Sequence, residues 1–152
     1  MKNPTKIIAL ALLALAGIFA SCGPKEKGPE YISLADTHWT CRYQKDTYVS
    51  YTSMRVYVDS ELKFISDTSG SIIIDYFADA LESNFSIGDT ITSTFSYQID
   101  PSGTGSLNNI QINNNNRSYP LTYNEAEQTI VLSTNEPILN TLGVKELTFT
   151  KD

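Results

Sequence analysis

The stretch TITSTFSYQID, residues 90–100, has the most regular alternation of apolar and polar side chains in the chain. Its large apolar residues Ile91, Phe95, Tyr97 and Ile99 occupy odd-numbered positions, and every even-numbered position is threonine, serine, glutamine or aspartate. A period of two is typical of a β-strand with one face buried and one face in water. The stretch therefore predicts a strand of an antiparallel sheet.

The same period of two runs through most of the chain from Thr37 onward. In the first such segment, Trp39, Cys41 and Tyr43 fall on one face, which predicts that Trp39 points inward. The run 71–78 is apolar on both faces and predicts a strand that is covered on both sides. The expected strands are 37–45, 48–58, one that begins at 62, 71–78, 90–100, 106–112, 117–123, 128–133 and 144–151.

Short turn signals separate these segments. Asp59 and Ser60 predict a turn, and residues 67–70 predict a hairpin turn that Gly70 closes with a positive φ. Leu107 is out of phase with the residues that follow it, which indicates a β-bulge. Residues 136–142 are compatible with a single helical turn ended by Gly143.

These segments predict an all-β protein with one antiparallel meander of eight or nine strands. No predicted helix is long enough to cover a parallel sheet, and the connections are as short as those of hairpins. A meander removes its exposed edges best by closing, so we expect a closed or nearly closed barrel. A two-sheet sandwich is the alternative, but the Cys-Trp-Cys spacing of an immunoglobulin core is absent from the sequence.

The amino terminus has the pattern of a lipoprotein signal peptide. Lys2 and Lys6 precede a charge-free apolar stretch, residues 7–20, which is too short to span a bilayer. The stretch ends in Phe19-Ala20-Ser21-Cys22, a lipobox in which small residues precede the cysteine that receives the lipid. We expect cleavage before Cys22, with an ordinary secretory signal peptide as the alternative.

Lipidation of Cys22 would hold the mature protein on a membrane, because several acyl chains anchor stably where one chain does not. Gly23 stands where an aspartate would signal retention in the inner membrane, so the expected location is the outer membrane, facing either side. We expect a removed signal peptide over residues 1–21, a lipidated tether over 22–33 and a barrel domain over 34–152. Residues 23–30 reach at most about 28 Å, which keeps the domain near the membrane.

Charge and cysteine content exclude several classes of function. Without the two lysines of the signal peptide, the chain has 9 basic and 17 acidic residues, a net charge of −8. This balance disfavours binding to nucleic acid. Once Cys22 is acylated, Cys41 has no partner for an internal disulfide and is expected to be buried and inert. The only histidine, His38, falls on the opposite face of the same predicted strand.

The lipobox, the short tether and Leu34-Ala35-Asp36-Thr37-His38-Trp39 at the start of the first strand resemble the bacterial lipocalin-like lipoproteins. Later segments fit the same layout, namely Leu62-Lys63-Phe64, Phe95-Ser96-Tyr97, Ile130-Val131-Leu132 and Leu147-Thr148-Phe149-Thr150-Lys151. The resemblance implies a lipocalin-like barrel with a cavity, and it implies that Trp39 plugs one end of that barrel. Members of this family mostly have no assigned role.

Signatures of catalysis are missing from the sequence. It has no nucleophile elbow, no phosphate-binding loop and too few histidines and cysteines for a zinc site. Asp75 is the one acid in an otherwise apolar strand, but the alternation also allows it to point outward. An enzyme would need a second acid facing Asp75 across a cleft. We therefore expect no enzymatic activity, no metal and no cofactor besides the covalent lipid on Cys22.

Nine tyrosines are the remaining notable feature of the composition. A tyrosine ring has an apolar face and a hydroxyl at its end, which suits both ligand pockets and protein interfaces. We expect Tyr43, Tyr57, Tyr76 and Tyr97 to bind a small apolar or amphipathic ligand in the barrel or at its mouth. An interior filled by side chains would argue against a carrier. The alternative is a non-enzymatic accessory or scaffold subunit that docks another envelope protein.

Overall fold

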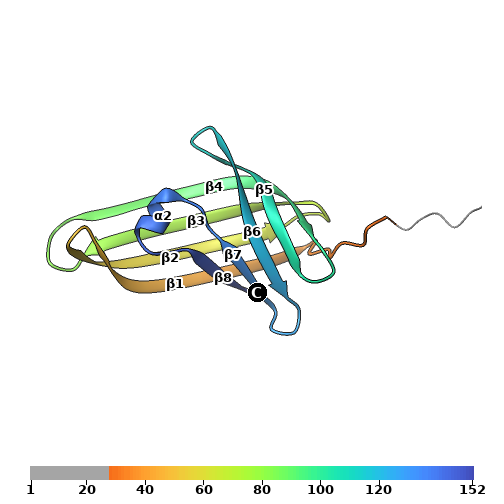
Figure 1. The fold of residues 1–152 in the computed structure, drawn as a ribbon, viewed down its shortest axis with the longest axis horizontal. Coiled ribbons are helices and arrows are strands. Elements are labelled where there is room, and N and C mark those ends of the chain that lie inside the picture. Colours follow the sequence, from red (N-terminus) through yellow and green to blue (C-terminus); the bar gives the residue numbers. More distant parts are fainter. Residues whose placement is uncertain (1–27) are drawn as a thin grey trace, which may run out of the picture. The chain divides into compact units, whose positions relative to one another are not determined.

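A computed structural model describes residues 28–152, of which Tyr31–Asp152 form one compact unit. Eight antiparallel strands follow one another in chain order, and the last strand pairs with the first to close a barrel (Figure 1). The prediction of an antiparallel meander closed into a barrel is confirmed. The elements are β1 (Thr37–Val49), β2 (Thr52–Phe64), β3 (Ser69–Ala80), β4 (Ser86–Ile99), β5 (Thr104–Ile112), β6 (Asn115–Asn124), β7 (Thr129–Ser133), α2 (Pro137–Thr141) and β8 (Glu146–Lys151).

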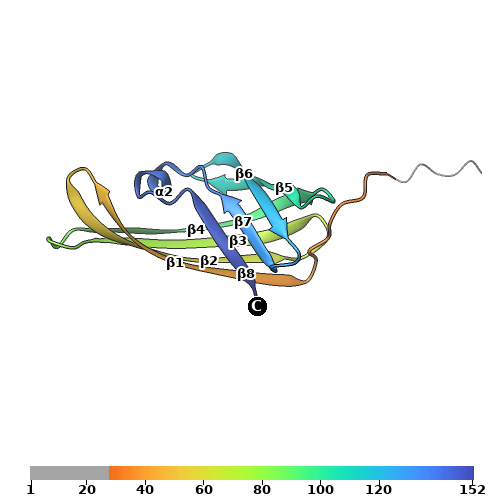
Figure 2. The same ribbon diagram turned by 60° about the horizontal axis from the view of Figure 1, so that its bottom comes forward.

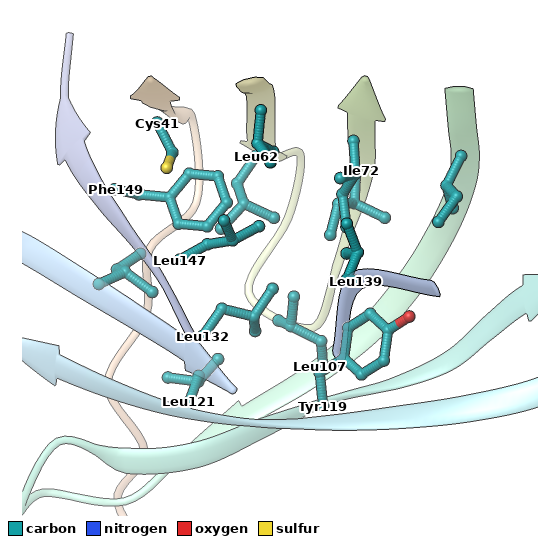
Figure 3. Close-up of a cluster of buried hydrophobic side chains, with 14 of the residues drawn as sticks. Cys41, Leu62, Ile72, Leu107, Tyr119, Leu121, Leu132, Leu139, Leu147 and Phe149 are labelled. Atoms are coloured by element: carbon teal, nitrogen blue, oxygen red, sulfur yellow. The ribbon is translucent and has the colours of Figure 1, made fainter. Parts of the chain in front are cut away.

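Side chains from all eight strands fill the interior of the barrel. In β4 the expected apolar face, Ile91, Phe95, Tyr97 and Ile99, is buried, and the alternating polar face is largely exposed. Figure 3 shows part of this core, where side chains from opposite walls meet. The largest fully buried side chains are Trp39, Tyr119, Phe64, Phe149, Leu62, Ile72, Ile74, Ile99, Leu107, Ile110, Ile130 and Leu132.

The first hairpin differs from the prediction. The expected turn at Asp59 and Ser60 is wrong, because β2 runs through both residues in unbroken register with β1 and β3. Ser60 is fully buried, and its hydroxyl donates a hydrogen bond of 2.7 Å to the carbonyl oxygen of Ile73. The chain turns instead at Ser50 and Tyr51, which both have positive φ.

Gly70 is needed for a different reason from the one predicted. It lies inside β3, and its φ is not in the left-handed region. A Cβ atom at this position would overlap the carbonyl oxygen of Lys63 and the ring of Phe95. Without one, Phe64, Phe95 and Tyr97 pack edge to face around the glycine, with ring centroids 4.8–6.3 Å apart.

The predicted bulge in β5 is present, but the predicted cover on both faces of β3 is not. The register of β5 and β6 shifts between Leu107 and Ile110, which confirms the bulge. The strand over residues 71–78 is covered only on its inner face, because Phe77 on the outer face is substantially exposed. The predicted cover on both sides is therefore wrong.

The two halves of the barrel differ in strand length, and at one end the long strands project beyond the short ones. Strands β1 to β4 have 12–14 residues, whereas β5 to β8 have 5–10. β8 pairs with β1 only at Trp39 and Thr40, and β5 pairs with β4 only over Ser96–Ile99. The long hairpins therefore extend past the short strands, as Figures 1 and 2 show. We call the end near residues 50 and 85 the barrel mouth.

Candidate functional site

The helix α2 lies at the barrel mouth, against the inner face of the long hairpins (Figure 1). The expected helical turn forms over Pro137–Thr141 and is followed by Gly143, whose φ of 76° confirms the predicted end. Leu139 and Leu142 are buried in the core, which fixes the helix in place. Its Ile138 stays half-buried and is available to form a wall of the mouth.

Between α2 and the hairpins lies an apolar groove of about 290 Å³, which we call the mouth groove. Six of its nine lining residues are apolar, and the other three carry hydroxyl groups. Phe85 on its rim is 58% exposed. The lining residues are Val49, Ser50, Thr52, Met54, Phe85, Ile87, Ile138, Thr141 and Leu142.

A buried polar network holds the start of α2. Glu136, the residue before the helix, is only 4% exposed. Its carboxylate accepts a hydrogen bond of 2.7 Å from the Tyr119 hydroxyl and lies 3.5 Å from Nε of Arg117. Burial, followed by the bond to Glu136, raises the pKa of Tyr119 well above its usual range, so the hydroxyl keeps its proton and donates. The network positions α2 and thereby one wall of the mouth groove.

The four tyrosines predicted to bind a ligand do not all line one cavity, although Tyr43 and Tyr57 both line a surface groove of about 420 Å³. Tyr43 and Tyr76 point inward from β1 and β3, since each lies opposite the buried Val58 of β2. Burial raises the pKa of Tyr76, with further contributions from Asp89 and Glu136. Tyr57 lies on the outer face of β2.

Tyr97 has a structural role at the end of the barrel opposite the mouth, which we call the closed end. Its hydroxyl donates to the carbonyl oxygen of Ser66 and accepts from the backbone N–H of Leu34, both at 3.0 Å. This pair of bonds ties the segment before β1 to the β2–β3 turn. The hydroxyl therefore already donates one hydrogen bond and accepts another, at the end of the barrel away from the mouth groove.

Comparison of the chain with protein-family models, curated proteins and solved structures found no match. Cys22, the predicted lipidation position, lies outside the described residues. From residue 28 to residue 152, no helix is long and apolar enough to cross a membrane. Nor does this part of the chain contain a cluster of three or more residues suited to bind a metal.

Asp75 points outward and does have a second acid beside it. It lies directly opposite Asp59 on β2, in a broad outer groove of about 820 Å³ that Glu61 and Asp152 also line. Both aspartates are exposed to water: Asp75 accepts a hydrogen bond of 3.0 Å from Thr90, and Asp59 lies 3.7 Å from Arg42. The pair lacks the apolar pocket that makes one carboxyl group a general acid in glycosidases.

Cys41 and His38 point to opposite faces of β1, as predicted. His38 lies on the outer face, with Nδ1 2.7 Å from a carboxylate oxygen of Asp152 and Nε2 3.4 Å from one of Glu61. Cys41 is buried on the inner face, and burial raises the pKa of its thiol to about 11. A catalytic cysteine needs a thiolate, whereas the thiol of Cys41 keeps its proton and is a weak nucleophile.

The buried thiol predicts very slow alkylation in the folded protein. In a Cys22→Ala variant, Cys41 is the only thiol, and at pH 8 about one molecule in a thousand would carry the thiolate. We expect iodoacetamide to modify the native protein at least about a hundredfold more slowly than the urea-unfolded protein, since burial also blocks access. Mass spectrometry of timed samples measures both rates, and equal rates would contradict the buried position.

Proposed function

We propose that the protein is an outer-membrane lipoprotein, anchored through Cys22, that binds one small apolar or amphipathic ligand in the mouth groove. The role is non-enzymatic, and the lipid on Cys22 is the only non-protein group that it requires. The mouth groove is the observation that supports the proposal, because it combines an apolar lining with an opening at the end of the barrel.

Because the interior of the barrel is packed, we place the proposed ligand at the mouth. Large side chains occupy the centre of the barrel, which counts against a carrier that encloses its ligand there. The mouth groove, at about 290 Å³, is near the lower end of the usual range of ligand pockets, roughly 300–1,000 Å³. It suits a short acyl chain or a single ring system.

The three hydroxyl groups of the groove favour an amphipathic ligand over a purely apolar one. Ser50 and Thr52 come from the β1–β2 hairpin, and Thr141 comes from the last residue of α2. A hydroxyl can donate or accept a hydrogen bond, so these residues suit a small polar head group. The apolar part of the ligand would then contact Met54, Ile87 and Leu142.

Docking of another envelope protein is the second candidate function. Large apolar side chains are exposed at the tips of both long hairpins: Tyr48 and Tyr51 on one, Leu81 and Phe85 on the other. Exposed apolar patches on a protein surface often mark an interface. A docked protein would cover these tips, whereas a small ligand would leave Tyr51, which is 92% exposed, in water.

Filling the mouth groove should weaken ligand binding. Thr52→Trp puts an indole into the groove without removing any apolar lining, so affinity falls through loss of space and of one of the three hydroxyl groups. We expect the lipid-free Cys22→Ala protein to bind a dansylated undecanoic acid probe, and we expect Thr52→Trp to weaken binding at least about tenfold. Fluorescence titration measures both affinities.

A matched control lies at the closed end of the barrel. Thr122 is exposed on β6, and Thr122→Trp adds the same side chain away from the mouth groove. Its affinity for the probe should equal that of the parent. Failure of the parent to bind, or equal weakening by both substitutions, would refute a ligand site at the mouth.

A further inference from the structure

Half of β1 has a free edge. β8 pairs with β1 only at Trp39 and Thr40, so from Arg42 to Val49 the strand pairs with β2 on one side and with no strand on the other, although Gly143, after α2, lies beside the side chain of Thr47. Figures 1 and 2 show β8 crossing β1 near the closed end, while the rest of β1 forms the outer edge of the long hairpins. The register with β2 continues without a shift to Val49, so no β-bulge interrupts this edge.

The backbone groups that face this free edge belong to even-numbered residues. The backbone N–H of Asp152 in the C-terminal segment donates to the carbonyl oxygen of His38, so the backbone of His38 faces the β8 side. Backbone groups alternate in direction along a strand. Those of Arg42, Gln44 and Asp46 therefore point away from β2. No side chain between residues 28 and 152 hydrogen-bonds to them.

The opposite edge of the long hairpins is blocked by its own side chains. On β4, the backbone N–H of Thr90 donates to the carboxylate of Asp89 at 2.8 Å. Close by, the hydroxyl of Ser93 accepts a bond of 2.8 Å from the backbone N–H of Gln111 in β5. Protected edges of this kind prevent pairing with other chains. The β1 edge has no such hydrogen bonds among the described residues.

We propose that the free edge of β1 pairs with the same edge of a second copy of this chain. The strands would run antiparallel about a two-fold axis at Gln44, which places Gln44 opposite its own copy. On each side of the axis, Arg42 of one copy then lies directly opposite Asp46 of the other. At all three positions the backbone N–H and C=O groups point away from β2. In this register they therefore face the same groups of the other copy, as a hydrogen-bonded antiparallel pair requires.

Charge complementarity fixes this register. The side chain of Arg42 is 88% exposed, and its ion pair with Asp59 on β2, at 3.7 Å, is a weak surface pair that Arg42 can exchange for one across the edge. Asp46 already accepts two hydrogen bonds from Arg55, at 2.7 and 3.0 Å, which hold its carboxylate on the outer face. Arg42 of the second copy would join this pair. A shift of two residues would instead place Arg42 opposite Gln44 and lose both ion pairs.

The partner is a second copy because the edge is complementary to itself. An isologous two-fold interface uses one surface twice, and it closes after two copies rather than growing into fibres. On the inner face, the same axis brings Tyr43 opposite Lys45 of the other copy, where an ammonium group can contact the ring. The dimer is independent of the mouth groove and its ligand.

A cysteine on the two-fold axis tests the dimer in the intact chain inside the cell envelope. Gln44→Cys would place two thiols on residues about 5.5 Å apart between Cα atoms, within the range that a disulfide bridges. We expect mild oxidation of whole cells to give a disulfide-linked dimer on a non-reducing gel. The native Cys41 is buried and does not interfere.

Two comparisons make the test decisive. Thr92→Cys places an exposed thiol on the blocked β4 edge and should give at least about fivefold less dimer. Adding Arg42→Asp to Gln44→Cys turns two attractive pairs into two repulsive ones, with a similar expected loss, whereas Arg42→Lys should retain the dimer. Equal cross-linking at both edges, or no effect of Arg42→Asp, would overturn the proposal.

Discussion

Replacing Cys22 with alanine is expected to move the protein completely from the membrane fraction to the soluble periplasm. The substitution removes the thiol that we propose receives the lipid, and with it the acyl chains that would hold the protein on the bilayer. The barrel supplies no replacement, because its acidic surface is repelled by anionic head groups. Fractionation of cells followed by immunoblotting measures the distribution.

Cys41→Ala is the matched control, since it removes the other cysteine without touching the lipobox. That variant should stay in the membrane fraction. A soluble Cys22→Ala protein must also keep the barrel, which circular dichroism can verify. Retention of folded Cys22→Ala protein in the membrane fraction would refute the lipid anchor.

Replacing Trp39 with alanine is expected to lower the free energy of unfolding by about 3–5 kcal/mol, the usual cost of removing a buried large aromatic side chain. Trp39 is almost fully buried and meets the ring of Tyr123 edge to face, with centroids 6.0 Å apart. Its indole N–H donates to the hydroxyl of Thr37 at 2.8 Å, which in turn donates to the carbonyl oxygen of Leu34. Alanine would lose the packing and leave a cavity.

Urea unfolding followed by circular dichroism measures this loss. Trp39→Phe should cost less than Trp39→Ala, because a ring still fills most of the space. Tyr51→Ala, at an exposed turn, should change the stability by no more than about 0.5 kcal/mol. Trp39→Ala with the stability of the parent would mean that this tryptophan does not plug the end of the barrel.

Most of the fold could be predicted because alternation along one strand reports which face is buried. The sequence of β4 shows this directly, and the out-of-phase Leu107 indicated the bulge. The turn between β1 and β2 could not be found in this way. Asp59 and Ser60 have turn propensity, but Ser60 is small enough to be buried and to hydrogen-bond to Ile73, so the strand continues.

The site was harder to predict, because its residues come from three separate segments of the chain. Val49 and Met54 lie on one hairpin, Phe85 and Ile87 on another, and Ile138 on α2. Their approach depends on the different lengths of the strands, which alternation does not encode. The alternation along β2 could have placed one of the tyrosines. Tyr57 lies between Val56 and Val58, which are buried, so its outward position could have been predicted.

Native mass spectrometry of the lipidated protein, extracted gently from its own membrane, tests the proposed function most directly. We expect one additional small apolar or amphipathic molecule per chain, beyond the proposed lipid on Cys22, and we expect the Thr52→Trp variant to lack it. The Thr122→Trp protein should retain it. A parent protein that carries only its covalent lipid, or an extra molecule that survives Thr52→Trp, would contradict a ligand site at the barrel mouth.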